Sequence, residues 1–146
     1  MSLTQWETNG WLRPHRTSRK EIANLLAIAD RDIADAASTD ISDDWKFGIA
    51  YNAALKLCTV MIYAAGYRPE ATLAHYRTLM AIEFTIGAHR QEDGIYLNAC
   101  RAKRNAVEYD NVGGASRAEA EELLAFVQGL RHEVLNILPE KYPDLV

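Results

Sequence analysis

Apolar residues recur at spacings of three and four along most of this 146-residue chain, and this periodicity constrains the fold more than any other feature. The four Pro and eight Gly fall almost entirely between the periodic segments, so they divide the chain into pieces of helix length. No segment shows the period-two alternation that is typical of a strand. We therefore predict an all-α domain, an antiparallel bundle of about five helices with short connections.

The predicted helices begin at capping signals and end at helix breakers. Ser18 with Glu21, and Ser116 with Glu119, are typical of capping boxes. The second helix is apolar over much of its circumference, which predicts that it is the central and most buried element; Gly66 ends it. The expected helices cover about 18–37, 42–66, 70–87, 94–111 and 116–138, with the last one ending before Pro139.

The composition is typical of one globular domain, with 49% apolar and 25% charged residues. We assign residues 18–138 to the bundle, 1–17 to an N-terminal arm and 139–146 to a C-terminal tail. A net charge of −4 gives no overall attraction to nucleic acid, so a nucleic-acid function would need a local basic patch. The polar start of the chain has no apolar core of signal-peptide length, and the apolar stretch near 59–66 is too short to span a membrane. We expect a cytoplasmic protein with no membrane partner.

Neither the cysteines nor the histidines predict a metal site. Cys58 and Cys100 lie in apolar helical stretches, which favours two buried free thiols over a disulfide between them, and they lack the paired spacing of zinc ligands. The four His form no i, i+4 pair with another His or with Cys. We expect no metal and no cofactor.

The helix expected at 94–111 carries an unusual number of polar residues. The residues that stack on one side of this helix, or flank that side, are Asn98, Arg101, Asn105, Glu108, Arg104 and Tyr109. The expected packing side consists mostly of small residues, namely Ala99, Cys100, Ala102, Ala106 and Val107. One interpretation is a solvated face, in which i, i+4 pairs such as Arg104 with Glu108 contribute roughly 0.2–0.5 kcal/mol each. The other is a phosphate cradle, because guanidinium groups bind phosphate with two parallel hydrogen bonds and keep their charge.

The run Arg101-x-x-Arg104-Asn105-x-x-x-Tyr109-Asp110 resembles the signature helix of the HEPN superfamily, small helical domains often associated with RNA cleavage or nucleotide-related systems. Residues 44–55 and 64–69 are similar to the second helix and the following turn of that family. His75, Tyr76 and Leu79 fit the segment after the turn. The resemblance extends over roughly Ser18 to Leu138.

The resemblance implies a metal-independent ribonuclease site at a homodimer cleft, in which an Arg and a His five positions later act on RNA. Arg104 and Asn105 match the start of that pattern, but Tyr109 stands at the His position. A Tyr side chain has an ordinary pKa near 10, so it donates a hydrogen bond well and is a poor general base. Glu108 beside it is a second candidate base. His75 could also supply the missing imidazole, although a hydrogen-bonded, partly buried His is the simpler interpretation.

We therefore expect first a module that binds the phosphate of a nucleic acid or nucleotide at a dimer cleft, in a toxin–antitoxin or stress-defence setting, with a cognate partner protein as a further expectation. Arg101, Arg104 and Asn105 would bind phosphate, Tyr109 would donate to it, and Asp110 would hold Tyr109 or a basic residue in place. The first alternative is a metal-independent endoribonuclease that uses Tyr109, Glu108 or His75. The second is a structural module whose polar helix only joins two protomers.

The N-terminal arm is the other basic segment of the chain. This basic segment around Pro14 runs from the arm into the start of the first predicted helix, and it consists of Arg13, His15, Arg16, Arg19 and Lys20. Such segments are commonly solvated tails, and the alternative is that this one helps to hold RNA.

Overall fold

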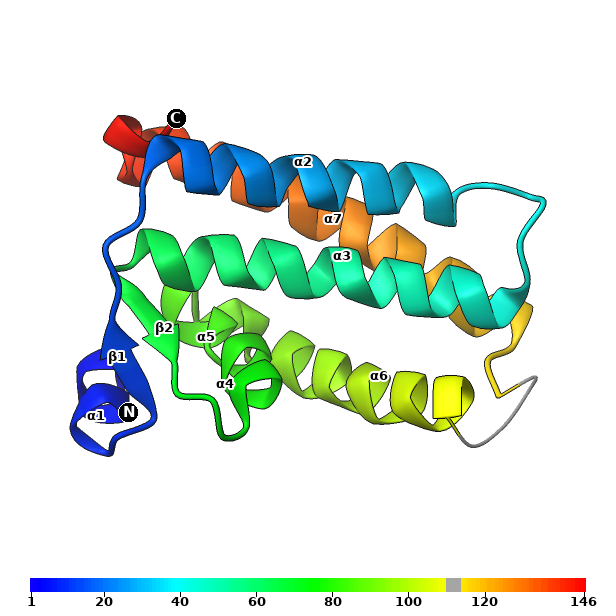
Figure 1. The fold of residues 1–146 in the computed structure, drawn as a ribbon, viewed down its shortest axis with the longest axis horizontal. Helices are drawn as coiled ribbons and strands as arrows, with labels where there is room; N and C mark the ends of the chain where they lie inside the picture. The colour runs from blue at the N-terminus through cyan, green and yellow to red at the C-terminus, as the bar shows by residue number, and fades with distance from the viewer. Residues whose placement is uncertain (110–113) are drawn as a thin grey trace.

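The computed structural model describes residues 1–109 and 114–146, with the main chain alone for 107–109. It is an all-α bundle with one short two-stranded ribbon, so the predicted fold class is confirmed (Figure 1). In chain order the elements are α1 (Leu3–Thr8), β1 (Leu12–Pro14), α2 (Arg19–Ala36), α3 (Asp43–Ala64), β2 (Tyr67–Pro69), α4 (Ala74–Met80), α5 (Ile82–Thr85), η1 (Ala88–Arg90), α6 (Gln91–Tyr109), α7 (Arg117–Lys141) and η2 (Pro143–Leu145).

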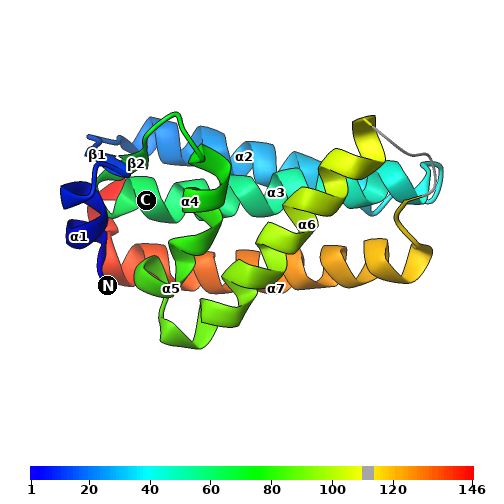
Figure 2. The same ribbon diagram turned by 90° about the horizontal axis from the view of Figure 1, so that it is seen from below.

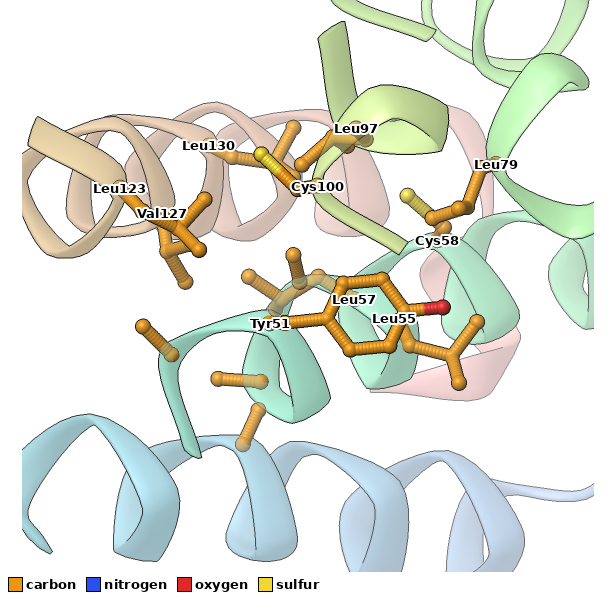
Figure 3. Close-up of a cluster of buried hydrophobic side chains, with 14 of the residues drawn as sticks. Tyr51, Leu55, Leu57, Cys58, Leu79, Leu97, Cys100, Leu123, Val127 and Leu130 are labelled. Carbon is orange, nitrogen blue, oxygen red and sulfur yellow. The ribbon is translucent and has the colours of Figure 1, made fainter. Parts of the chain in front are cut away.

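Helix α3 is the central element, as its apolar circumference predicts. It packs against α2, α6 and α7, and it runs antiparallel to α2 (Figure 1). Its side chains Tyr51 and Leu57 face core residues of the neighbouring helices, including Leu97 of α6 and Leu130 of α7 (Figure 3). By length and composition α3 could also cross a membrane, but 72% of its apolar window is buried inside the bundle. Burial in the core is a sufficient reason for this apolar composition.

Ser hydroxyls start the long helices at the predicted positions. Ser18 accepts a hydrogen bond from the main-chain N–H of Glu21. Ser116 and Glu119 form the complete reciprocal capping box. At the end of α3, Gly66 has φ +94°, a left-handed conformation that glycine adopts without steric cost.

The N-terminal arm is folded against the bundle. Strand β1 pairs antiparallel with β2, placing Arg13 opposite Arg68. Trp6 of α1 and Leu12 of β1 are buried against α3 and the α4–α5 region. The strands are too short to show alternation, which explains why the period-two test does not detect them.

Three predictions of helix bounds are wrong. The fourth helix is expected to start near Gly94, whereas α6 begins at Gln91. The single helix expected over 70–87 is instead a turn followed by the short helices α4 and α5, and Leu73 takes a left-handed conformation (φ 58°) just before α4. Helix α7 continues through Pro139 to Lys141. Buried Leu138 anchors that last turn, and its carbonyl accepts the N–H of Tyr142 at 2.8 Å.

Candidate functional site

The inner face of α6 is a stripe that begins apolar and becomes basic. Gly94, Leu97 and Cys100 are buried at spacings of three, and Arg104, four residues after Cys100, continues the stripe as a half-buried side chain. The predicted packing side is therefore only partly correct. Cys100 belongs to it, whereas Ala99 and Ala102 are exposed on the outer side of the helix. Arg104 consequently points toward the bundle, which a solvated-face interpretation does not explain.

Arg104 lies over the ring of Tyr51, a fully buried residue of α3. The guanidinium carbon is 5.6 Å from the ring centroid, within the range of a cation–π contact. Burial raises the pKa of Tyr51 to about 12, against the opposing effect of Arg101 and Arg104. The Tyr51 hydroxyl makes no hydrogen bond to the rest of the described chain. The ring therefore gives Arg104 a rigid support, while the hydroxyl is a polar group buried at a cost.

Arg101 and His75 meet across the contact between α6 and α4. Both line an open surface hollow of about 290 Å³, together with Ala71, Leu73, Ala74 and Tyr76. Asn98 accepts a hydrogen bond from Arg101 Nε at 2.9 Å, which orients the guanidinium group on the helix. Within the described residues Arg101 has no carboxylate partner.

The close approach of α4 to α6 depends on Gly94. A Cβ atom built at this position would lie 3.2 Å from the main-chain oxygen of Leu79 in α4. Since glycine has no Cβ, the two helices can approach closely there, and α4 brings His75 near Arg101. Figure 2 shows α4 lying beside α6 when the molecule is seen from below.

The basic cluster, as we define it, consists of Lys56 of α3, His75 of α4, and Arg101 and Arg104 of α6. Partial burial of the ring lowers the pKa of His75 first, and Arg104, Lys56 and Arg101 lower it further. Lys56, like Arg101, has no carboxylate partner among the residues the structure describes. Cations are thus gathered at one place in a chain whose net charge is −4. Such an arrangement attracts an anion.

The structure brings together three of the residues predicted for the site and adds two. Arg101, Arg104 and His75 converge, and His75 makes no hydrogen bond within the described chain. Asn105 is exposed on α6. The side chains of Glu108 and Tyr109, and Asp110 as a whole, lie outside the described part of the structure. Tyr51 and Lys56 were not assigned to the site from the sequence. The signal that could have identified them is that both are polar side chains on the otherwise apolar helix α3.

Other reactive groups do not join the basic cluster. Cys58 and Cys100 are free and buried, as predicted, and burial raises the pKa of the Cys58 thiol to about 12. Lys103 of α6 pairs with Glu119 of α7 at 2.7 Å, so it links the two helices. No group of three metal-ligating side chains occurs within 1–106 and 114–146, where side chains are described. Comparison of the chain with protein-family models, curated proteins and solved structures finds no match.

Proposed function

We propose that this chain is a HEPN-like helical module that binds the phosphate groups of a nucleic acid or nucleotide at the basic cluster. The observation that carries the proposal is the convergence of Lys56, His75, Arg101 and Arg104, two of them without a carboxylate partner in the described chain. A phosphate offsets the mutual repulsion of these groups and accepts hydrogen bonds from each guanidinium. Arg104 adds rigidity, because its guanidinium lies over the buried ring of Tyr51.

The proposal includes a homodimer formed across α6 in a cytoplasmic protein, with a toxin–antitoxin or stress-defence setting as its context. Support for the dimer comes from an apolar stripe on the outer side of α6. Ile95 is 56% exposed, and Ala99 and Ala102 follow it at i+4 and i+7, also exposed. A stripe of this kind can pack against its own copy about a two-fold axis.

A metal-independent endoribonuclease is the second candidate function, and the position of His75 favours it. Its lowered pKa leaves the imidazole neutral near pH 7, so it can take the proton of a ribose 2′-hydroxyl. That oxygen then forms a bond to the adjacent phosphorus while the bond from phosphorus to the 5′-oxygen breaks. The leaving oxygen takes up a proton, and the guanidinium groups stabilise the charge on the phosphate.

The test uses the dinucleotide UpU, which carries one phosphodiester and no terminal phosphate. We expect wild-type protein to bind UpU. Each of the substitutions Arg101→Gln and Arg104→Gln should weaken that binding about tenfold or more, because a charge-assisted hydrogen bond contributes roughly 1.5–3 kcal/mol. Thermal melting of each variant checks folding. Arg117→Gln is the matched control, since Arg117 is an exposed Arg whose one ion-pair partner among the described residues is Glu121. Equal UpU affinity in folded wild type and cluster variants refutes the proposal.

Incubation with a mixed RNA in EDTA separates binding from cleavage. Cleavage that disappears in both Arg104→Gln and His75→Gln, with the size-exclusion mass unchanged, establishes the nuclease. Binding without cleavage establishes the binding module, and Tyr109→His then asks whether restoring the family His creates activity. If Arg104→Gln alters only the monomer–dimer balance and wild-type protein binds no UpU, the structural module is the correct interpretation.

A further inference from the structure

A second group of basic side chains lies where the β1–β2 ribbon leads into α2. Its members, which we call the ribbon patch, are Arg16, Arg19, Lys20 and Arg68. All four are exposed, and none forms an ion pair with any other described residue. The neighbouring Arg13 pairs with Glu70, and His15 contacts Glu21 at 2.7 Å and the ring of Tyr63. The ribbon patch thus consists of the residues of the basic segment that make no such contact, together with Arg68 of the paired strand β2.

Two features of the ribbon patch disfavour folding. Arg68 stands directly opposite Arg13 in the ribbon, where like charges at paired positions of antiparallel strands are destabilising, and the ion pair of Arg13 with Glu70 offsets part of this repulsion. Arg19 and Lys20 occupy the first turn of α2, where the helix dipole favours acidic groups. A bound polyanion relieves both kinds of repulsion at once. Placements that are unfavourable for the fold but favourable for an anion are typical of a binding surface.

The ribbon patch is close to the basic cluster along the chain. Ala71, which lines the hollow beside His75 and Arg101, stands three positions after Arg68. Three residues of extended chain span at most about 11 Å. At about 3.4 Å per nucleotide of one strand, that distance corresponds to roughly three stacked nucleotides. Figure 1 shows β2 continuing through a loop to the start of α4.

We propose that the ribbon patch binds a second stretch of phosphates, so that the ligand of this protein is a single-stranded oligonucleotide that extends from the basic cluster to the β1–β2 ribbon. This inference rests on the proposed function for its first contact and on the ribbon patch for its second. A lipid surface fits less well, because the large apolar side chains of the arm, Trp6 and Leu12, are buried. The ribbon therefore presents charge without an apolar anchor.

The experiment compares UpU with a ten-nucleotide oligouridylate by fluorescence anisotropy. Wild-type protein should bind the longer ligand about tenfold or more tightly, because its additional phosphates reach the ribbon patch. The triple variant Arg19→Gln, Lys20→Gln, Arg68→Gln should lose this gain and keep its affinity for UpU. Its plot of log affinity against log salt should become shallower by about two, since each phosphate contact contributes roughly 0.7 for single strands.

Arg117→Gln is again the matched control, because Arg117, like Arg19, is the exposed first residue of a long helix. The start of α7, where Arg117 stands, lies at the end of the bundle opposite to the start of α2 (Figure 1). A triple variant that binds the oligouridylate as tightly as wild type overturns the inference and leaves the basic cluster standing. If wild type binds no UpU but its binding of the longer ligand depends on the ribbon patch, the basic cluster fails and the ribbon patch stands. The inference is also overturned if wild type binds phosphatidylserine vesicles and no oligonucleotide, and the triple variant loses the vesicle binding.

Discussion

Tyr51 allows the support of Arg104 to be tested with two substitutions that act in opposite directions. Tyr51→Phe removes the buried hydroxyl that makes no hydrogen bond within the described chain, and it keeps the ring under Arg104. An unsatisfied buried polar group costs about 1–3 kcal/mol, so we expect Tyr51→Phe to raise the free energy of unfolding by about 1 kcal/mol after the small gap is counted. For a domain of this size, that change corresponds to a melting temperature about 2–4 °C higher.

Tyr51→Leu removes the aromatic face as well. It loses a cation–π contact of about 0.5–2 kcal/mol and part of the ring packing, so we expect a loss of about 2–3 kcal/mol. Urea unfolding followed by tryptophan fluorescence measures both changes, and UpU binding measured on the folded variants reports on Arg104. Tyr51→Phe should bind as wild type does, whereas Tyr51→Leu should bind more weakly. If Tyr51→Phe destabilises the protein by more than about 1 kcal/mol, the hydroxyl has a partner and the reasoning fails.

Three other predictions concern the basic cluster, the contact of α4 with α6, and the start of α7. A bound phosphodiester should raise the lowered pKa of His75, so UpU affinity should increase as pH falls, and this increase should be lost as pH rises through the pKa of the complex. Titration between about pH 5 and 8 checks this, and a pH dependence that persists in His75→Gln rejects it. Gly94→Ala places a Cβ against the main chain of α4. Overpacking there costs about 1–3 kcal/mol, which exceeds the gain of about 1 kcal/mol in helix propensity, so the melting temperature and the UpU affinity should both fall. A stabilised variant with full UpU affinity argues against the close approach of the two helices. Ser116→Ala removes the cap of α7 and should cost about 1 kcal/mol in urea unfolding without changing UpU binding; no loss of stability means that the cap is not needed.

The sequence predicts those parts of the fold in which local and tertiary preferences agree. Helix α7 has both a capping box and an apolar stripe of Leu123, Val127 and Leu130, and it begins where expected. Prediction fails between Glu70 and Gly87, because the left-handed conformation of Leu73 is a tertiary choice that leucine disfavours on its own. At Pro139 packing decides against the local signal, since buried Leu138 holds the final turn of α7 in place.

The candidate site is predictable in its residue types and not in its orientation. Arg101 and Arg104 stand out as arginines in a polar helix, but the small residues around them give little information about which side packs. The structure settles that question through Gly94, Leu97 and Cys100, which set the inner stripe that Arg104 continues. The approach of His75 from α4 depends on a helix-to-helix contact, and contacts of this kind leave no periodic signal in the sequence.

The central claim is that the basic cluster binds phosphate, and calorimetric titration of UpU into wild type and the double variant Arg101→Gln, Arg104→Gln tests it most directly. We predict saturable binding at one site per chain in wild type, little or no heat in the double variant, and wild-type behaviour in Arg117→Gln. Folding of each protein is confirmed by its melting curve. Undiminished binding of UpU by a folded double variant, or a wild-type protein that binds none, would contradict the account.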